Sequence, residues 1–169
     1  MSSYSPASRS RVVLVPGRDA SGASAWPRQH GLALDFDALF LRQDPEKPLD
    51  AETLIETLGG VPAAVVAHGE GSTAAVNAAV ERPLLVSALV LCEPWLPELT
   101  ARNPGEQGDG IIPGVPMLVV SGGWEPAYER IARLLAESGA EHVVVPGGHR
   151  PQDSPEGADA IKAFLRRHL

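Results

Sequence analysis

The sequence of 169 residues has little of several features that restrict what a protein can be. Its single cysteine, Cys92, excludes an internal disulfide and fits a reducing compartment, so we expect a cytoplasmic protein. An apolar run of about 18 residues, the length needed to span a membrane as a helix, is absent. Basic residues are outnumbered, 14 against 21 acidic, which gives a net charge of −7 at pH 7. We therefore expect neither a membrane nor a nucleic acid as partner.

Lysine is also scarce, since Lys47 and Lys162 are the only two among 14 basic residues. This preference for arginine indicates a GC-rich genome, and we expect a bacterial source. Residues 1–10 are polar and lack the apolar block of a signal peptide, so they predict a disordered N-terminal tail. The remaining residues, 11–169, are long enough to form one domain with a buried core.

Six short apolar segments alternate with segments of helical character. The predicted strands cover residues 12–15, 37–42, 63–66, 87–92, 116–121 and 143–145. Helices are predicted after Ser24, after Asp50, after Gly71, after Pro126 and from about Ser154. Residues 97–113 have no hydrophobic period and predict a long loop. Strands that are apolar throughout predict a mostly parallel six-stranded sheet in a three-layer α/β/α sandwich, with functional residues at the carboxyl ends of the strands.

One stretch, residues 63–75, combines a buried strand, a sharp turn and the start of a helix. Gly69 and Gly71 permit a turn in which a side chain would clash, and the small residues from Ser72 onward let a helix lie close to the sheet. Other strand ends carry short motifs in a fixed order. These are Val15-Pro16-Gly17, Ala67-His68-Gly69-Glu70-Gly71, Gly122-Gly123-Trp124-Glu125-Pro126 and Pro146-Gly147-Gly148-His149.

The order of these motifs resembles that of the α/β-hydrolase superfamily, whose nucleophile elbow has the form G-x-S-x-G. The resemblance covers nearly the whole chain after residue 11 and implies a minimal member without a cap domain, with the 12–15 strand beside the 63–66 strand. This sequence departs from the family at the central position of the elbow, where Gly69 replaces the nucleophilic serine. The atom that attacks the substrate in family members is therefore missing.

The same resemblance implies roles for several other residues. His149 matches the catalytic base of the family, while Glu125 matches the usual position of the acid and Glu93 an alternative one; we slightly favour Glu125. The oxyanion hole, made of backbone N–H groups, corresponds to Glu70 together with Arg18 or Asp19, next to Gly17. The carboxylate of Glu70 would oppose a developing oxyanion unless it points away or is protonated.

Other candidates have weaker patterns. Trp26, Trp95 and Trp124 follow predicted strands and could line an aromatic pocket for a flat ligand or cover the rim of the core. His68 precedes the elbow apex, where a structural hydrogen bond is the more common role. Ser72 lies inside the predicted helix, so we expect its hydroxyl to bond to a backbone carbonyl rather than to act as the nucleophile.

The remaining histidines, His30, His142 and His168, have no constellation around them, and no metal-ligand spacing occurs. We expect no cofactor, and the sequence leaves the oligomeric state open.

Three functions fit this pattern. The first is an enzyme in which a His/Glu pair acts as general base, with a backbone oxyanion hole, on a small carbonyl compound, as in a lyase, an isomerase, a cyclase or a cofactor-free oxygenase. The second is a serine ester or thioester hydrolase in which glycine has replaced the nucleophile. The third is a pseudoenzyme that binds a ligand without catalysis. The retained histidine and carboxylates favour the two enzymes over the pseudoenzyme, which does not need that pair, and we take the first as the main hypothesis.

Overall fold

Six strands of the described chain form one sheet in which every neighbouring pair is parallel. The computed structural model describes residues 8–18, 22–100 and 114–169. Its strands, in the spatial order β2-β1-β3-β4-β5-β6, are β1 (Arg11–Val15), β2 (Asp37–Phe40), β3 (Ala63–His68), β4 (Val86–Cys92), β5 (Met117–Ser121) and β6 (Glu141–Val144). The predicted strands and the pairing of β1 with β3 are confirmed, with Val12 opposite Ala64.

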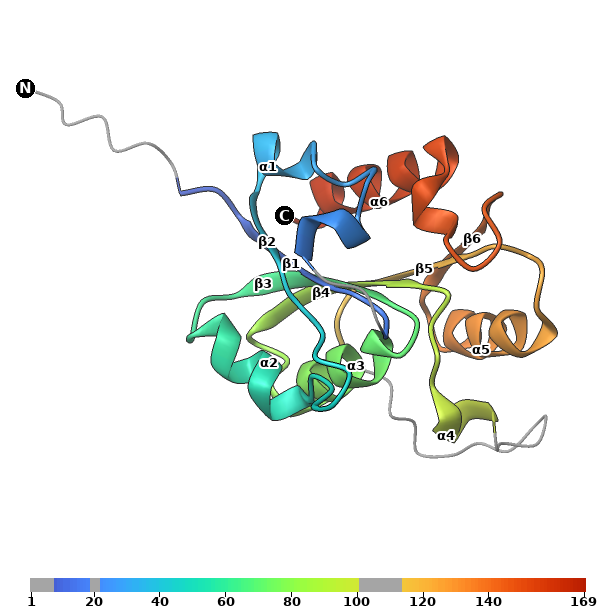
Figure 1. Cartoon of the computed structure of the whole chain (residues 1–169), viewed down its shortest axis with the longest axis horizontal. Coiled ribbons are helices and arrows are strands. Elements are labelled where there is room, and N and C mark those ends of the chain that lie inside the picture. Colours follow the sequence, from blue (N-terminus) through green and yellow to red (C-terminus); the bar gives the residue numbers. More distant parts are fainter. Residues whose placement is uncertain (1–7, 19–21, 101–113) are drawn as a thin grey trace, which may run out of the picture.

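Helices cover both faces of the sheet, as the three-layer prediction requires (Figure 1). One face carries α1 (Leu32–Asp35) and α6 (Pro155–His168), and the other carries α2 (Ala51–Leu58), α3 (Gly71–Glu81) and α5 (Pro126–Glu137). Short 3₁₀ turns, η1 (Gly22–Ala25) and η2 (Pro151–Asp153), lie in the connections. Within the described ranges, no helix is long and apolar enough to cross a membrane.

Two predicted segments differ from expectation or cannot be compared. The predicted loop at 97–113 begins with a short helix, α4 (Pro97–Thr100), and its residues 101–113 lie outside the described residues. Residues 1–7 of the predicted tail also lie outside them. The helix starts predicted at Asp50 and Ser154 are confirmed, since Asp50 accepts a hydrogen bond from the Thr53 N–H and Ser154 accepts one from the Gly157 N–H. The prediction of a helix after Ser24 is wrong, because Ser24 lies inside the 3₁₀ turn η1, which begins at Gly22.

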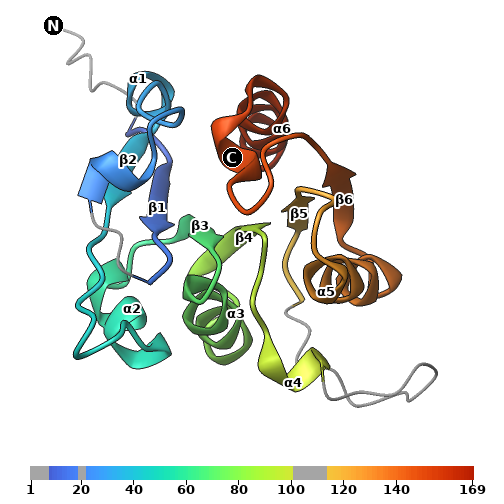
Figure 2. The same cartoon turned by 45° about the vertical axis from the view of Figure 1, so that its right-hand side comes forward.

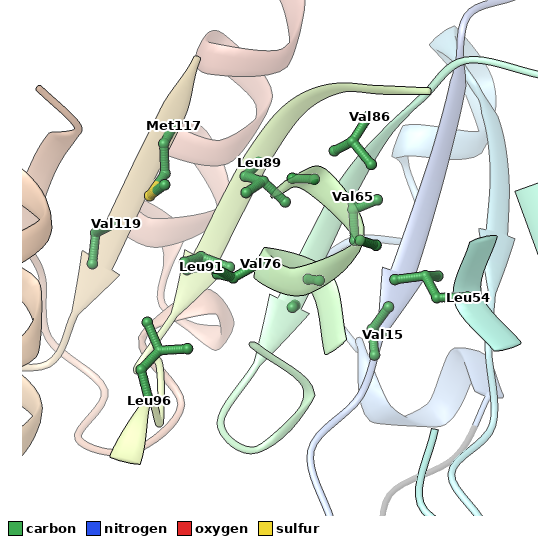
Figure 3. Packing of buried hydrophobic residues seen from close by; sticks show 14 of the residues in the cluster. Val15, Leu54, Val65, Val76, Val86, Leu89, Leu91, Leu96, Met117 and Val119 are labelled. Carbon is green, nitrogen blue, oxygen red and sulfur yellow. The ribbon is translucent and has the colours of Figure 1, made fainter. Parts of the chain in front are cut away.

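Each face of the sheet has its own hydrophobic core, because every strand residue points to one side or the other. On the α2, α3 and α5 side, Leu54 and Val76 pack in one cluster with Val65 and Leu89 (Figure 3). Leu135 of α5 belongs to the same cluster. The opposite core joins Trp26 and Phe164 to Val66 and Val90. Figure 2 shows β3 and β4 at the centre, with α3 on one side and α6 on the other.

The loops that follow β3, β4, β5 and β6 meet at one edge of the sheet. Backbone hydrogen bonds link them: the Gly69 N–H donates to the Cys92 carbonyl, the Glu93 N–H to the Val120 carbonyl, and the Val145 N–H to the Ser121 carbonyl. This edge is the carboxyl end of the parallel strands, where functional sites of such folds lie. All four elbow and loop motifs found in the sequence are brought together there.

Helix α3 approaches the loop after β1 so closely that its first residue must be glycine. A β-carbon on Gly71 would lie 2.7 Å from the carbonyl oxygen of Pro16 and 3.0 Å from Cγ1 of Val15. Gly31 has no such restriction, because a β-carbon there would meet nothing within 4 Å, and the residue has an ordinary φ of −63°.

We predict that Gly71→Ala lowers the free energy of unfolding by about 1–3 kcal/mol, because backbone must shift to admit the methyl group. Urea denaturation of the two variants measures this difference. Gly31→Ala is the matched control and should change stability by less than about 0.5 kcal/mol. Equal stability of the two variants would contradict the close approach at residue 71.

Candidate active site

The chain turns sharply at Gly69, directly after β3. Gly69 has φ of +55°, a conformation that glycine adopts readily, and its carbonyl accepts hydrogen bonds from the N–H groups of Ser72 and Trp95. The predicted tight apex with positive φ is confirmed. All six residues of β3 are buried, so the strand delivers Gly69 to the sheet edge from inside the core.

His149 lies directly over this apex. A β-carbon on Gly69 would be 3.8 Å from Nε2 of His149, so a side chain at position 69 would point at the imidazole. The turn before His149 uses Gly147 and Gly148, with φ of +123° and +57°. Arg150 anchors the same loop through an ion pair with Asp153 and a hydrogen bond to the Ala25 carbonyl.

His68 holds the backbone of this loop from below. Its Nε2 is 2.7 Å from the carbonyl oxygen of His149. Since a carbonyl only accepts, the neutral ring carries its proton on Nε2. Burial lowers the pKa of His68 to about 4, against the opposing effect of this hydrogen bond. The expected structural role of His68 fits this contact, and Gly17 leaves room for the ring, since a β-carbon there would lie 3.2 Å from Nδ1.

The side chain of Glu93 lies beside the loop that carries His149. It is fully buried, and its Oε1 accepts hydrogen bonds from the Gly122 N–H at 2.8 Å and from Nε1 of Trp124 at 3.0 Å. A β-carbon on Gly122 would overlap the carbonyl of Gly148 and lie 2.9 Å from Oε1 of Glu93. The carboxyl group therefore lies beside the residue that precedes His149.

Two features mark Glu93 as an unusual residue. It has φ of +44°, in the left-handed region that non-glycine residues seldom adopt, and such strain concentrates at functional sites. Burial is the main cause that raises the pKa of its carboxyl group. Oε2 of Glu93 and Nδ1 of His149 are both buried without a hydrogen-bond partner among the described residues. Among the described residues, therefore, no hydrogen bond joins Nδ1 of His149 to either candidate carboxylate, Glu93 or Glu125.

Glu125, the carboxylate favoured from the sequence, has a different partner. It is the N-cap residue of α5, where its side chain accepts from the Ala127 N–H at 3.5 Å. Pro126 occupies the first turn of the same helix, so the Glu-Pro pair acts as a helix start. Within its described ranges, the structure shows no hydrogen bond from Glu125 to His149.

The predicted oxyanion hole is partly occupied by the protein itself. Oε2 of Glu70 accepts a hydrogen bond of 3.3 Å from the Arg18 N–H, one of the two predicted donors. The Glu70 carboxylate thus points toward the place predicted for the oxyanion hole rather than away from it. Asp19, the alternative donor, lies outside the described residues.

Only two of the three tryptophans lie at the site surface. Trp26 is fully buried, edge-on to His68, so its place is in the core and not on a pocket wall. Trp95 and Trp124 flank Tyr128, with ring centroids 5.7 and 6.2 Å from it. Tyr128 in turn lies 5.2 Å from the His149 ring. The rings of Trp95, Trp124 and Tyr128 therefore form a continuous aromatic wall beside the imidazole.

Tyr128 is a site residue that the sequence motifs do not indicate. Its position in the first turn of a helix that starts at the sheet edge is the available signal, since that turn must lie near the site. Ser72 also differs from expectation: it is fully buried, and its hydroxyl has no partner among the described residues. Its burial leaves it without access to a substrate.

A second cluster, which the sequence also does not indicate, lies behind the loop after β5. Ser121 Oγ is 2.7 Å from Nε2 of His142 and donates to Oε2 of Glu129 at 3.0 Å, while the Gly123 N–H donates to Oε1 of Glu129. These contacts fix the backbone that presents Trp124. In the described part of the chain, no three His, Cys, Asp or Glu side chains are placed to hold a metal ion.

Comparisons with known proteins give the fold a name. No protein-family model matches this sequence, and no curated protein matches it. Among solved structures, NosK from Streptomyces actuosus is 21% identical with a TM-score of 0.72, over 95% of this chain and 99% of that one. A thermophilic esterase from Thermogutta terrifontis is 16% identical with a TM-score of 0.69, over 96% and 92%.

The carboxylesterase of Bacillus cereus is a further example, 15% identical with a TM-score of 0.64, over 95% of this chain and 89% of that one. Together these similarities show that the chain has the α/β-hydrolase fold. Identities this low establish the fold alone, so the chemistry must be argued from the residues of this site.

The lowered pKa of His68 predicts a pH dependence of stability. Between pH 6.5 and about 4 the unfolded chain takes up a proton at this residue and the folded one does not, so stability should fall as the pH falls through this window. The contribution is at most about 3 kcal/mol. Denaturant unfolding at pH 7.5, 5.5 and 4.5 measures it. His68→Gln should flatten the profile, whereas the control His168→Gln should keep it; identical profiles for both would contradict the burial of a neutral His68.

Proposed function

We propose that this protein is an enzyme without a covalent nucleophile, in which His149 acts as general base on a small carbonyl compound bound over Gly69. The observation that carries the proposal is the position of Nε2 of His149, 3.8 Å from where a side chain at residue 69 would begin. A serine hydroxyl would fill this space, and with glycine a substrate can occupy it. The base then meets a substrate proton directly.

The surrounding groups suit proton removal. Glu93, buried next to the His149 loop, would stabilise the imidazolium that forms when Nε2 takes up a proton. The Glu70 N–H stands at the start of α3, where the helix dipole favours negative charge, and would receive the developing enolate oxygen. Chemistry of this kind includes that of lyases, isomerases, cyclases and cofactor-free oxygenases.

Each of the two alternative functions is supported by one specific observation. The contact of the Glu70 carboxylate with the Arg18 N–H favours a pseudoenzyme that binds a ligand, because a carboxylate in the hole opposes an oxyanion. The alignment of His149 with the apex favours a serine hydrolase in which glycine has replaced the nucleophile.

A ketone that exchanges its α-protons tests the base directly. With phenylacetone in D2O, we expect the protein to accelerate exchange at the carbon next to the carbonyl, followed by NMR. His149→Ala should reduce the accelerated rate by roughly 10²–10⁴-fold, the usual contribution of a positioned base. His168→Ala, an exposed histidine on α6, is the control and should leave the rate unchanged. An unchanged rate in His149→Ala would refute the proposal.

A serine-directed fluorophosphonate separates the hydrolase alternative. We expect the mass of the protein to remain unchanged after treatment, because glycine offers no side chain to carry the label. If Gly69→Ser gains both labelling and esterase turnover, the base and the oxyanion hole serve a hydrolase and the second function is favoured. Labelling of the unaltered protein at Ser72 would contradict the assignment of the elbow.

A further inference from the structure

Glu70, the residue after Gly69, places a negatively charged side chain in the site. Oε2 of Glu70 is held by the Arg18 N–H, and it would lie 3.7 Å from a β-carbon on Gly17. In a hydrolase this place would bind an oxyanion. In this protein it contains the carboxylate of Glu70. Such a site disfavours a second anion and favours a group that donates hydrogen bonds or carries positive charge.

A cavity of about 250 Å³ adjoins this carboxylate. It lies between the elbow, the loop after β1 and the segment that joins β2 to α2, and its lining residues are Arg18, Gln43, Asp44, Pro45, Pro48, Leu49, Glu70 and Trp95. The wall combines two carboxylates, one indole ring and a prolyl and leucyl surface. Arg18, whose backbone holds Glu70, is the one basic residue among the described residues that line it.

The far wall of the cavity is held in shape by its own hydrogen bonds. Nε2 of Gln43 donates to the Pro16 carbonyl at 3.2 Å, and Oε1 of Gln43 accepts from the Leu49 N–H at 2.9 Å. Oδ1 of Asp44 accepts from the Glu46 N–H at 3.0 Å. These hydrogen bonds hold the segment against the loop after β1 in the absence of a ligand. The segment therefore loses less conformational entropy when a ligand binds.

We propose that this cavity binds an organic ammonium ion, with the charged nitrogen between Glu70 and the Trp95 ring and the apolar part against Pro45, Pro48 and Leu49. A carboxylate and an indole face both attract a cation, the first by its charge and the second by its quadrupole. The prolyl and leucyl surface supplies contact area for a hydrocarbon body.

The electrostatic environment around the aromatic wall supports this choice. Burial raises the pKa of the Tyr128 hydroxyl, and the carboxylates of Glu70, Glu93 and Glu125 raise it further. The face that joins the cavity to His149 therefore has a negative potential, which concentrates cations at the site.

Taking the bound molecule to be the substrate rests on the proposed function, whereas binding of the cation does not require His149. An ammonium group next to Glu70 would neutralise the carboxylate that otherwise opposes an enolate at the Glu70 N–H. The substrate class then becomes an amine that also contains the reacting carbonyl group. In this arrangement the charge of the substrate removes the electrostatic obstacle to its own reaction.

Three probes of nearly equal shape test the proposal: phenethylammonium, neutral 2-phenylethanol and anionic phenylacetate. Binding is followed at pH 7 by the indole N–H signal of Trp95 in ¹H–¹⁵N NMR spectra. We expect phenethylammonium to bind at least about tenfold more tightly than the alcohol. Glu70→Gln should abolish this preference while its amide oxygen still accepts from the Arg18 N–H. Glu81→Gln, at the other end of α3, is the matched control and should keep it.

The outcomes separate this proposal from the proposed function. His149→Ala should bind phenethylammonium as tightly as the unaltered protein, so loss of catalysis and loss of binding are distinguishable. Equal affinity for the cation and the alcohol, or no measurable binding of the cation, would overturn the ammonium site. If phenylacetate binds best and Glu70→Gln strengthens its binding, the cavity is instead an anion site that Glu70 blocks.

Discussion

The hydrogen bond from Nε2 of His68 to the carbonyl of His149 is the contact on which the site geometry depends. It joins the buried end of β3 to the loop after β6, two segments 81 residues apart in sequence. Because His68 and Gly69 are consecutive, the same strand that forms the elbow also fixes the backbone of the residue above it. The ring of His149 therefore keeps its place over the apex even though no side chain at position 69 holds it.

The fold could be predicted from the sequence because its signals are local. Continuous apolar strands, the small residues after Gly69 and the capping residues each determine their own segment, and together they specify a parallel sheet. The partners of the two candidate carboxylates could not be predicted in this way. Gly-x-x-Glu-Pro is both a family motif and a helix start, and the structure uses it as a helix start. Glu93 is buried by strands and loops that come from elsewhere in the chain.

The turn after β3 departs from the G-x-S-x-G pattern of the α/β-hydrolase elbow at two adjacent positions. Gly69, with φ of +55°, has no hydroxyl where that pattern has serine, and the Glu70 carboxylate accepts a hydrogen bond from the Arg18 N–H. The replacement of serine by Gly69 could be recognised from the sequence alone, because it concerns the identity of a single residue. The direction of the Glu70 side chain depends on its contact with the loop after β1, which only the three-dimensional arrangement shows. Fold and function are separable here at the level of single residues.

The central claim is that Nε2 of His149 is a free base facing the apex, and the tautomer of the neutral ring tests it most directly. ¹⁵N NMR of the imidazole at pH 8 distinguishes a protonated from an unprotonated ring nitrogen. A free Nε2 predicts a proton on Nδ1 and none on Nε2. Glu93→Gln should change the Nδ1 signal, and Glu125→Gln should leave it as it is. A proton on Nε2, or a response to Glu125→Gln alone, would contradict the account.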